Sequence, residues 1–174
     1  MKTSNLILAG VIGLLAYGSV LVSAQEQEPY VGSKAFEQMK LLVGEWEGTM
    51  DMGKGPETIT ATYKLTSGGS AIVETVFEGA QHEMVTVYHD NANRTLSMTH
   101  YCMLGNQPKM VLEGMENNEL KFDLSEDADI DVASDTHMHS LALKFDGQDQ
   151  MTQHWTDFKA GKASKSVDIA FKRV

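Results

Sequence analysis

Basic residues and cysteine are scarce in this chain of 174 residues. It has 14 Lys and Arg against 24 Asp and Glu, a formal net charge of -10 at pH 7, and its only cysteine is Cys102. A single cysteine excludes an internal disulfide. An acidic surface repels nucleic-acid phosphates and anionic lipids, and no cluster of Lys and Arg stands out to offset that repulsion. We therefore predict no nucleic-acid partner and no strong binding to membrane surfaces.

Sequence motifs of common enzyme classes are also missing. The chain has no nucleophile elbow, no phosphate-binding loop and no zinc-protease helix motif. No internal repeat or low-complexity segment indicates a second domain, and helical patterns do not alternate with strands as a parallel α/β sheet requires. The sequence thus assigns no catalytic residue and leaves open whether the protein is an enzyme.

The N-terminal residues have the pattern of an export signal. Lys2 gives a positive start, residues 6–22 are mostly apolar, and a small-x-small pattern ends at Ala24. We predict cleavage after Ala24 and a periplasmic or secreted location. The predicted division is a signal peptide at 1–24, a linker at 25–32 and one domain at 33–174. Because the apolar run is long for a signal peptide, a retained N-terminal anchor is the alternative.

Beyond the linker, short segments alternate apolar and polar residues. Ser33 is placed to cap a short helix over 34–43, with Phe36, Met39 and Val43 as its apolar stripe. The period then changes to two, the spacing of half-buried strands. The first predicted strand begins at residue 46. The others cover 58–65, 71–78, 83–90, 95–104, 109–114, 120–124, 138–145, 151–158 and 164–172. Because so many consecutive hairpins have exposed edges to protect, we predict an all-β fold: an up-and-down antiparallel β-barrel of about ten strands with a short N-terminal helix. A β-sandwich is the alternative.

The start of the first strand carries a family resemblance. Residues 41–48, Leu-Leu-Val-Gly-Glu-Trp-Glu-Gly, are similar to the Gly-x-Trp start of calycin barrels, which include lipocalins, fatty-acid-binding proteins and nitrobindin-like haem barrels. Segments 68–71, 82–84, 99–102, 105–108 and 137–139 resemble a family of largely uncharacterised bacterial secreted proteins with this barrel. The resemblance implies the fold and a small apolar ligand, but no reaction. The alternating glycines of nitrobindin-like barrels are absent after Gly48, so no haem-binding histidine is transferred.

Alternation also indicates which strand residues face the interior. In 95–104, His100 and Cys102 share the apolar face, whereas Tyr101 lies on the other. In the strand that starts near 137, His137 and His139 share a face with the apolar residues that follow. Because apolar faces form the interior of a barrel, we predict that all three histidines and Cys102 point inward.

These four residues form the candidate ligand-binding and metal site. Imidazole and thiolate groups suit Zn or another transition metal, and a single histidine can hold haem iron. In the alternative interpretation, His100, His137 and His139 only form hydrogen bonds inside the barrel, and Cys102 is an inert buried thiol. Tyr63 is a further candidate for orienting a ligand.

Glu74 completes the set of candidates. Ile72 and Val76 lie at two-residue spacing from it, but the opposite face of this strand is apolar as well, so its direction is ambiguous. If Glu74 points inward, burial would raise its pKa and it could act as an acid or base beside a histidine. Because unpaired buried carboxylates are rare, we favour a surface position.

Three hypotheses for the function follow. The first is an exported barrel that binds a small apolar or amphipathic ligand. The second is a metal- or haem-dependent barrel, which could be an enzyme, using the same histidines. The third is a structural or interaction domain whose barrel is filled by its own side chains.

Overall fold

The structure is a computed structural model that describes residues 28–51, 53 and 55–174. The signal peptide predicted at 1–24 and the start of the predicted linker lie outside these residues. Within the described part, no helix has the length and apolar character needed to cross a membrane.

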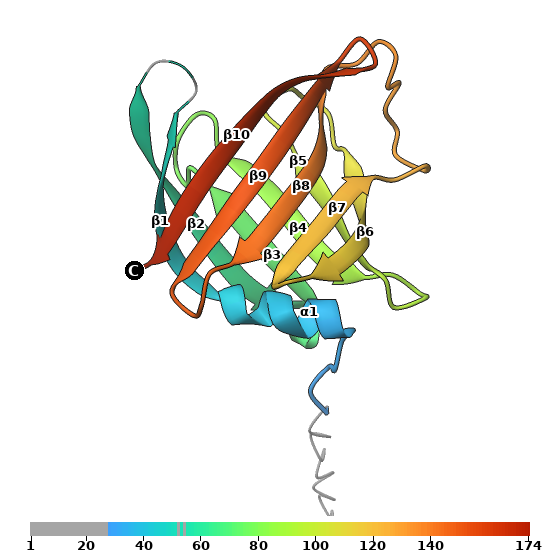
Figure 1. Cartoon of the computed structure of the whole chain (residues 1–174). Helices are drawn as coiled ribbons and strands as arrows, with labels where there is room; N and C mark the ends of the chain where they lie inside the picture. The colour runs from blue at the N-terminus through green and yellow to red at the C-terminus, as the bar shows by residue number, and fades with distance from the viewer. Residues whose placement is uncertain (1–27, 52, 54) are drawn as a thin grey trace, which may run out of the picture.

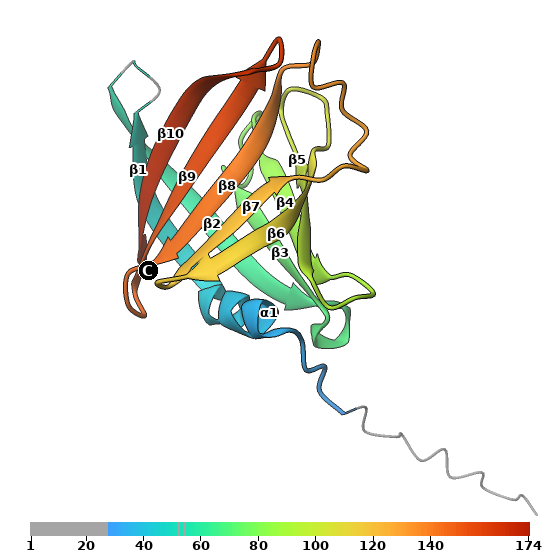
Figure 2. The same ribbon diagram turned by 45° about the vertical axis from the view of Figure 1, so that its right-hand side comes forward.

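The described residues form ten antiparallel strands that close into one barrel (Figures 1 and 2). The helical elements are α1 (Lys34–Met39), η1 (Lys40–Leu42) and η2 (Ser67–Gly69). The strands are β1 (Gly44–Asp51), β2 (Pro56–Thr66), β3 (Ala71–Val76), β4 (Met84–Asp90), β5 (Leu96–Tyr101), β6 (Lys109–Glu116), β7 (Glu119–Leu124), β8 (His137–Phe145), β9 (Gln150–Lys159) and β10 (Lys162–Arg173). Each strand pairs with its neighbours in sequence, and β1 pairs with β10, with Trp46 opposite Arg173. The predicted up-and-down β-barrel with a short N-terminal helix is confirmed, and the β-sandwich is excluded.

The helix α1 covers one end of the barrel, which we call the closed end (Figure 1). Ser33 caps the helix by accepting a hydrogen bond from the third helical N–H, at 3.1 Å. Asp90 of β4 accepts from the Ser33 N–H at 2.5 Å and from its hydroxyl at 2.7 Å, which ties the helix to the barrel. The helix is shorter than the sequence predicts, because it ends at Met39 and tightens into η1. Leu42 therefore faces the core, whereas Val43 is 39% exposed.

Large apolar side chains fill the closed half of the barrel. Five of them are at most 1% exposed: Phe36, Met39 and Leu42 from the helices, Trp46 of β1 and Phe171 of β10. Burial of this size contributes roughly 2 kcal/mol or more per large side chain. The closed half is therefore a packed core.

Residues of β1 and β10 seal this core. A Cβ at Gly48 would lie 2.7 Å from the Phe171 ring, so only glycine allows the two strands to approach this closely. The Arg173 guanidinium lies 4.3 Å from the centre of the Trp46 ring. It also donates to the backbone carbonyl of Leu41 at 2.6 Å, where the end of η1 leaves acceptors free.

Candidate ligand-binding site

The half of the barrel away from α1 is hollow. It contains a cavity of about 710 Å³ that is bordered by the turns between β1 and β2, β5 and β6, and β9 and β10. These turns lie at the end of the barrel opposite α1, which we call the open end (Figures 1 and 2). The apolar wall consists of Met50, Ile59, Val76, Phe77, Met84, Met138, Val167 and Ile169. The polar residues deepest in the cavity, which we call the floor, are Glu74, Thr86, His100, Gln153 and Trp155.

The register of four neighbouring strands places Tyr63 and three of the floor residues in a row. Tyr63 of β2 lies opposite Glu74 of β3, Glu74 lies opposite Thr86 of β4, and Thr86 lies opposite His100 of β5. Directly opposed residues on antiparallel strands have their side chains on the same face, about 5 Å apart. All four residues are buried in the barrel, so the row runs along the inner face of β2, β3, β4 and β5.

Glu74 lies at the centre of this row and is only 1% exposed. Its Oε1 accepts from the Tyr63 hydroxyl at 2.8 Å and from Gln153 Nε2 at 2.6 Å, and its Oε2 accepts from the Tyr88 hydroxyl at 2.7 Å. The surface position that we favoured from the sequence is therefore wrong. The expectation assumed an unpaired carboxylate, whereas three donors from β2, β4 and β9 compensate for the lost hydration.

The donors around Glu74 are themselves held in place. Burial, followed by the nearby Glu74 carboxylate, raises the pKa of Tyr63 and of Tyr88 well above the ordinary tyrosine value, so both hydroxyls stay protonated. Gln153 Nε2 also donates to the Tyr63 oxygen at 2.7 Å, and Trp155 Nε1 donates to Gln153 Oε1 at 2.8 Å. Each of these donors thus finds its acceptor within the network around Glu74. Tyr63, a sequence candidate, belongs to this network but does not line the cavity.

His100 borders the cavity beside this network, 4% exposed, as predicted from alternation. Its Nδ1 lies 2.9 Å from the Thr86 hydroxyl, and its ring centre lies 4.9 Å from that of Trp155. Burial lowers the pKa of His100 to about 4, so the ring is neutral at physiological pH. His100 Nε2 has no hydrogen-bond partner among the described residues. It is nevertheless not a fully buried unpaired atom, because Asn106 Oδ1 is the one such side-chain nitrogen or oxygen in that part of the chain. His100 Nε2 is therefore accessible from the cavity that the residue lines.

Cys102 follows β5 and lines the cavity nearer its mouth, also in agreement with the predicted facing. It is partly buried, and burial raises the pKa of its thiol. A raised pKa keeps the group as a thiol, which is a poorer nucleophile and metal ligand than a thiolate. Tyr101, before it, is 50% exposed on the outer face.

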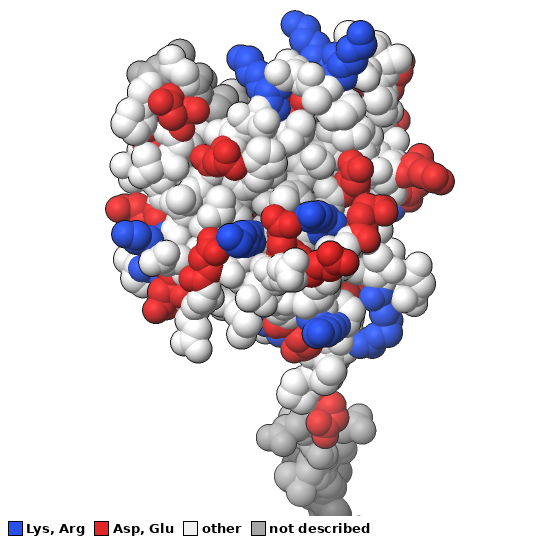
Figure 3. Space-filling model, in the orientation of Figure 1, with Lys and Arg blue, Asp and Glu red and all other residues white. Residues whose placement is uncertain are grey.

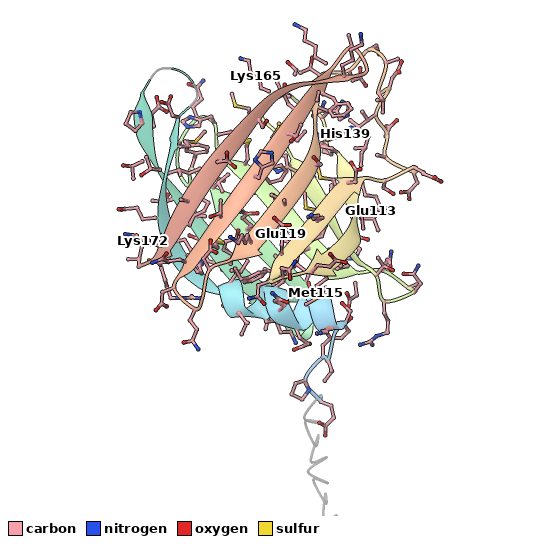
Figure 4. All side chains as sticks on the ribbon, in the orientation of Figure 1. Glu113, Met115, Glu119, His139, Lys165 and Lys172 are labelled. Carbon is pink, nitrogen blue, oxygen red and sulfur yellow. The ribbon has the colours of Figure 1, made fainter. Side chains whose placement is uncertain are left out.

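The prediction that His137 and His139 point inward is wrong. The pairing of β8 with β9 shifts between Met138 and Ser140, which makes His139 the extra residue of a β-bulge. The bulge reverses the alternation toward the start of β8, so Met138 lines the cavity in place of the histidines. Figure 4 shows His139 at the open end of β8.

The two histidines form a chain of contacts at the start of β8, away from the cavity, where His137 is fully buried (0% exposed). His137 Nδ1 lies 3.0 Å from the Asp135 carbonyl, and its Nε2 lies 2.9 Å from His139 Nδ1. His139 Nε2 lies 3.4 Å from an Asp123 carboxylate oxygen, and the ring stacks on Phe158 at 3.6 Å between centres. Burial lowers the pKa of His139, although Asp123 acts in the opposite direction.

The structure therefore separates the four residues of the predicted metal site. His100 and Cys102 line the cavity, whereas His137 and His139 lie outside it. Across residues 28–51, 53 and 55–174, no group of three His, Cys, Asp or Glu side chains is arranged to hold a metal ion. The residues present thus do not fit a zinc site with several protein ligands.

Sequence reasoning missed Thr86, Gln153 and Trp155. Each of them lies on the inward face of its strand. The sequence of one strand does not show that such a residue belongs to a site, because its hydrogen-bond and packing partners lie on other strands. It also missed three lysines, Lys159, Lys162 and Lys165, in and beside the β9–β10 turn. Figure 3 shows basic side chains gathered at the open end, above a belt of mixed charge, and Figure 4 labels Lys165 there. Lys159 and Lys165 line the mouth of the cavity.

Comparison with known proteins gives no match to this chain, either among protein-family models or among curated proteins. The family resemblance inferred from the sequence therefore stays a hypothesis. The closed antiparallel barrel is compatible with it.

Proposed function

We propose that this chain is an exported, calycin-like barrel that binds a small apolar or amphipathic molecule in its open half. The observation that carries the proposal is the cavity of about 710 Å³, which has an apolar wall and a polar, hydrogen-bonded floor. Small-molecule sites in proteins usually have this size and this division between apolar walls and a few placed polar groups. A barrel filled by its own side chains, the third hypothesis, does not account for such a space.

The floor gives the site a means of orienting its ligand. Glu74, Tyr63 and Gln153 already use their hydrogen-bonding groups on one another. His100 Nε2 is the floor group with spare capacity, and Thr86 fixes the ring through Nδ1. We therefore expect a ligand to pack along the apolar wall and to contact His100 at its inner end.

The two tryptophans provide a direct test. Trp155 lines the cavity, whereas Trp46 is buried in the closed half. A bound apolar probe such as the uncharged N-phenyl-1-naphthylamine should quench Trp155 by energy transfer in a Trp46→Phe variant. Truncating the wall with Ile59→Ala and Val76→Ala should weaken binding severalfold, while the exposed control Thr60→Ala leaves it unchanged. Absence of saturable binding of every apolar probe tried would contradict the proposal.

A second candidate function is haem binding through His100. The observation that favours it is a neutral imidazole whose Nε2 faces an apolar cavity while its Nδ1 contacts Thr86. One axial histidine is enough to hold haem iron, and the iron then supplies redox or gas-binding chemistry. Addition of haemin should then give a Soret band that is lost in His100→Ala and kept in His139→Ala. No spectral change on haemin addition would exclude this candidate.

Export is the remaining part of the proposal and is supported by the N-terminal pattern that ends at Ala24. The mass of the protein recovered after expression with its own N-terminus tests it. A mature chain that begins at Gln25 supports cleavage, whereas an intact chain in the membrane fraction supports a retained anchor.

A further inference from the structure

We propose that the ligand of this cavity is an anionic amphiphile that enters with its apolar end first, and that Lys159 and Lys165 hold its anionic group at the mouth. This inference rests on the proposed function, because it assumes that the cavity binds a small molecule. It adds the charge of the ligand and its direction in the site.

The floor of the cavity is unsuited to an anion. Glu74 carries an acidic group there, and the only described cationic residues that line the cavity are Lys159 and Lys165, both at its exposed rim. His100 is neutral at physiological pH because burial lowers its pKa to about 4. An anion placed beside Glu74 would therefore meet a like charge at low dielectric, with no cation to compensate.

The mouth differs from the floor because it contains cationic side chains: Lys159 and Lys165 line it together with Asp51 and Asp157. Each of these two aspartates accepts a backbone hydrogen bond, Asp51 from Gly53 N–H at 2.7 Å and Asp157 from Lys165 N–H at 2.5 Å. In the described part of the chain, the ammonium groups of Lys159 and Lys165 form neither an ion pair nor a hydrogen bond. These two cations are therefore free to pair with an anionic group that stays at the rim.

An apolar route leads from this rim to the interior. Met103 and Leu104, in the turn after β5, line the mouth and are 66% and 52% exposed. Exposed apolar side chains beside an apolar cavity mark a contact surface for an apolar partner. The wall then continues inward through Met84 and Val76. A molecule with an apolar tail and an anionic head matches this sequence of surfaces from inside to outside.

Three single-chain ligands of equal length separate the charge classes: dodecanoate, dodecanol and dodecylammonium. Their affinities are measured by Trp155 fluorescence in the Trp46→Phe variant at low salt. Dodecanoate should bind most tightly, and Lys159→Gln with Lys165→Gln should weaken it roughly fivefold to tenfold, as expected for two exposed ion pairs. The same double variant should leave dodecanol affinity unchanged. Lys64→Gln with Lys172→Gln is the control, because it removes the same charge from exposed strand positions that do not line the cavity.

Bromine labels test the direction of the bound chain. Bromine quenches tryptophan only at short range, and Trp155 is a floor residue. We expect 12-bromododecanoate to quench Trp155 more strongly than 2-bromododecanoate at saturation. The reverse order would show the head group at the floor and would overturn the inference.

The outcomes also distinguish this inference from the proposed function. If dodecanol or dodecylammonium binds at least as tightly as dodecanoate, the cavity binds amphiphiles but the anionic selectivity is wrong. If the lysine variant and its control weaken dodecanoate equally, Lys159 and Lys165 do not hold the head group. If none of the three ligands binds, both the inference and the amphiphile-binding function fail.

Discussion

The two halves of the barrel interior are built from the same alternating strands but are filled differently. In the closed half, Phe36 of α1, Trp46 and Phe171 belong to one buried apolar cluster. In the open half, the same strands border a cavity, and smaller or flexible side chains such as Val76 and Met84 line it. The floor network around Glu74 lies between the two. The comparison suggests that stability is concentrated at the closed end, which leaves the open half available for binding.

The largest expected effect is the loss of a large side chain from the closed half. Phe36→Ala should lower the free energy of unfolding by about 3–5 kcal/mol, because it leaves a cavity in a packed core. Met84→Ala, in the cavity wall, should cost about 1 kcal/mol, since that side chain already borders empty space. Urea unfolding with an unchanged m-value measures both. Equal losses would show that the two halves contribute alike.

The floor network should rank next. Glu74→Ala removes the acceptor for three buried donors and should cost about 3 kcal/mol, since each unsatisfied buried group costs about 1–3 kcal/mol. Tyr63→Phe keeps the ring and removes one donor, so about 1 kcal/mol is expected. Glu57→Ala, at an exposed position of β2, serves as the control and should change stability by less than about 0.5 kcal/mol. A Glu74 variant as stable as this control would contradict the buried network.

Acid should destabilise the protein through His100. Its pKa is about 4 in the folded state and near 6.5 when unfolded, so the unfolded chain binds the proton first. The contribution of neutral His100 is fully present above about pH 6.5 and is lost as the pH falls toward 4, by roughly 3 kcal/mol. His100→Gln should flatten the dependence of unfolding free energy on pH in this window. An unchanged slope in the variant would mean that His100 is not buried as a neutral ring.

The smallest effect is expected for His139, at the start of β8 and away from the cavity. His139→Ala removes the stack on Phe158, the contact with Asp123 and the partner of the buried His137 Nε2, and should cost about 1–2 kcal/mol. Ligand affinity should stay unchanged, in contrast to His100→Ala, because His139 does not line the cavity. A loss of affinity comparable to that of His100→Ala would restore the inward position predicted from the sequence.

The sequence was sufficient to predict which side chains face the interior where the alternation of a single strand is regular. Regular alternation along 95–104 correctly placed His100 and Cys102 inward and Tyr101 outward. The same reasoning failed for His137 and His139, because a single bulge residue reverses every facing before it. Bulges depend on the fit between two neighbouring strands, and apolar and polar alternation within one strand does not reveal them.

The sequence by itself determined the strand-rich single barrel, its short capping helix and the inward face of most strands, because these depend on local periodicity and turn residues. Only the tertiary structure decided which polar groups meet inside. The burial of Glu74 depends on hydrogen-bond donors from other strands. Tyr63 is 11 residues away in the sequence, and Gln153 is 79 residues away. The mouth likewise combines Lys159 and Lys165 with Met103 from another strand connection. Closure of the barrel creates these neighbours, since hydrogen bonding and charge act through space while periodicity acts along the chain.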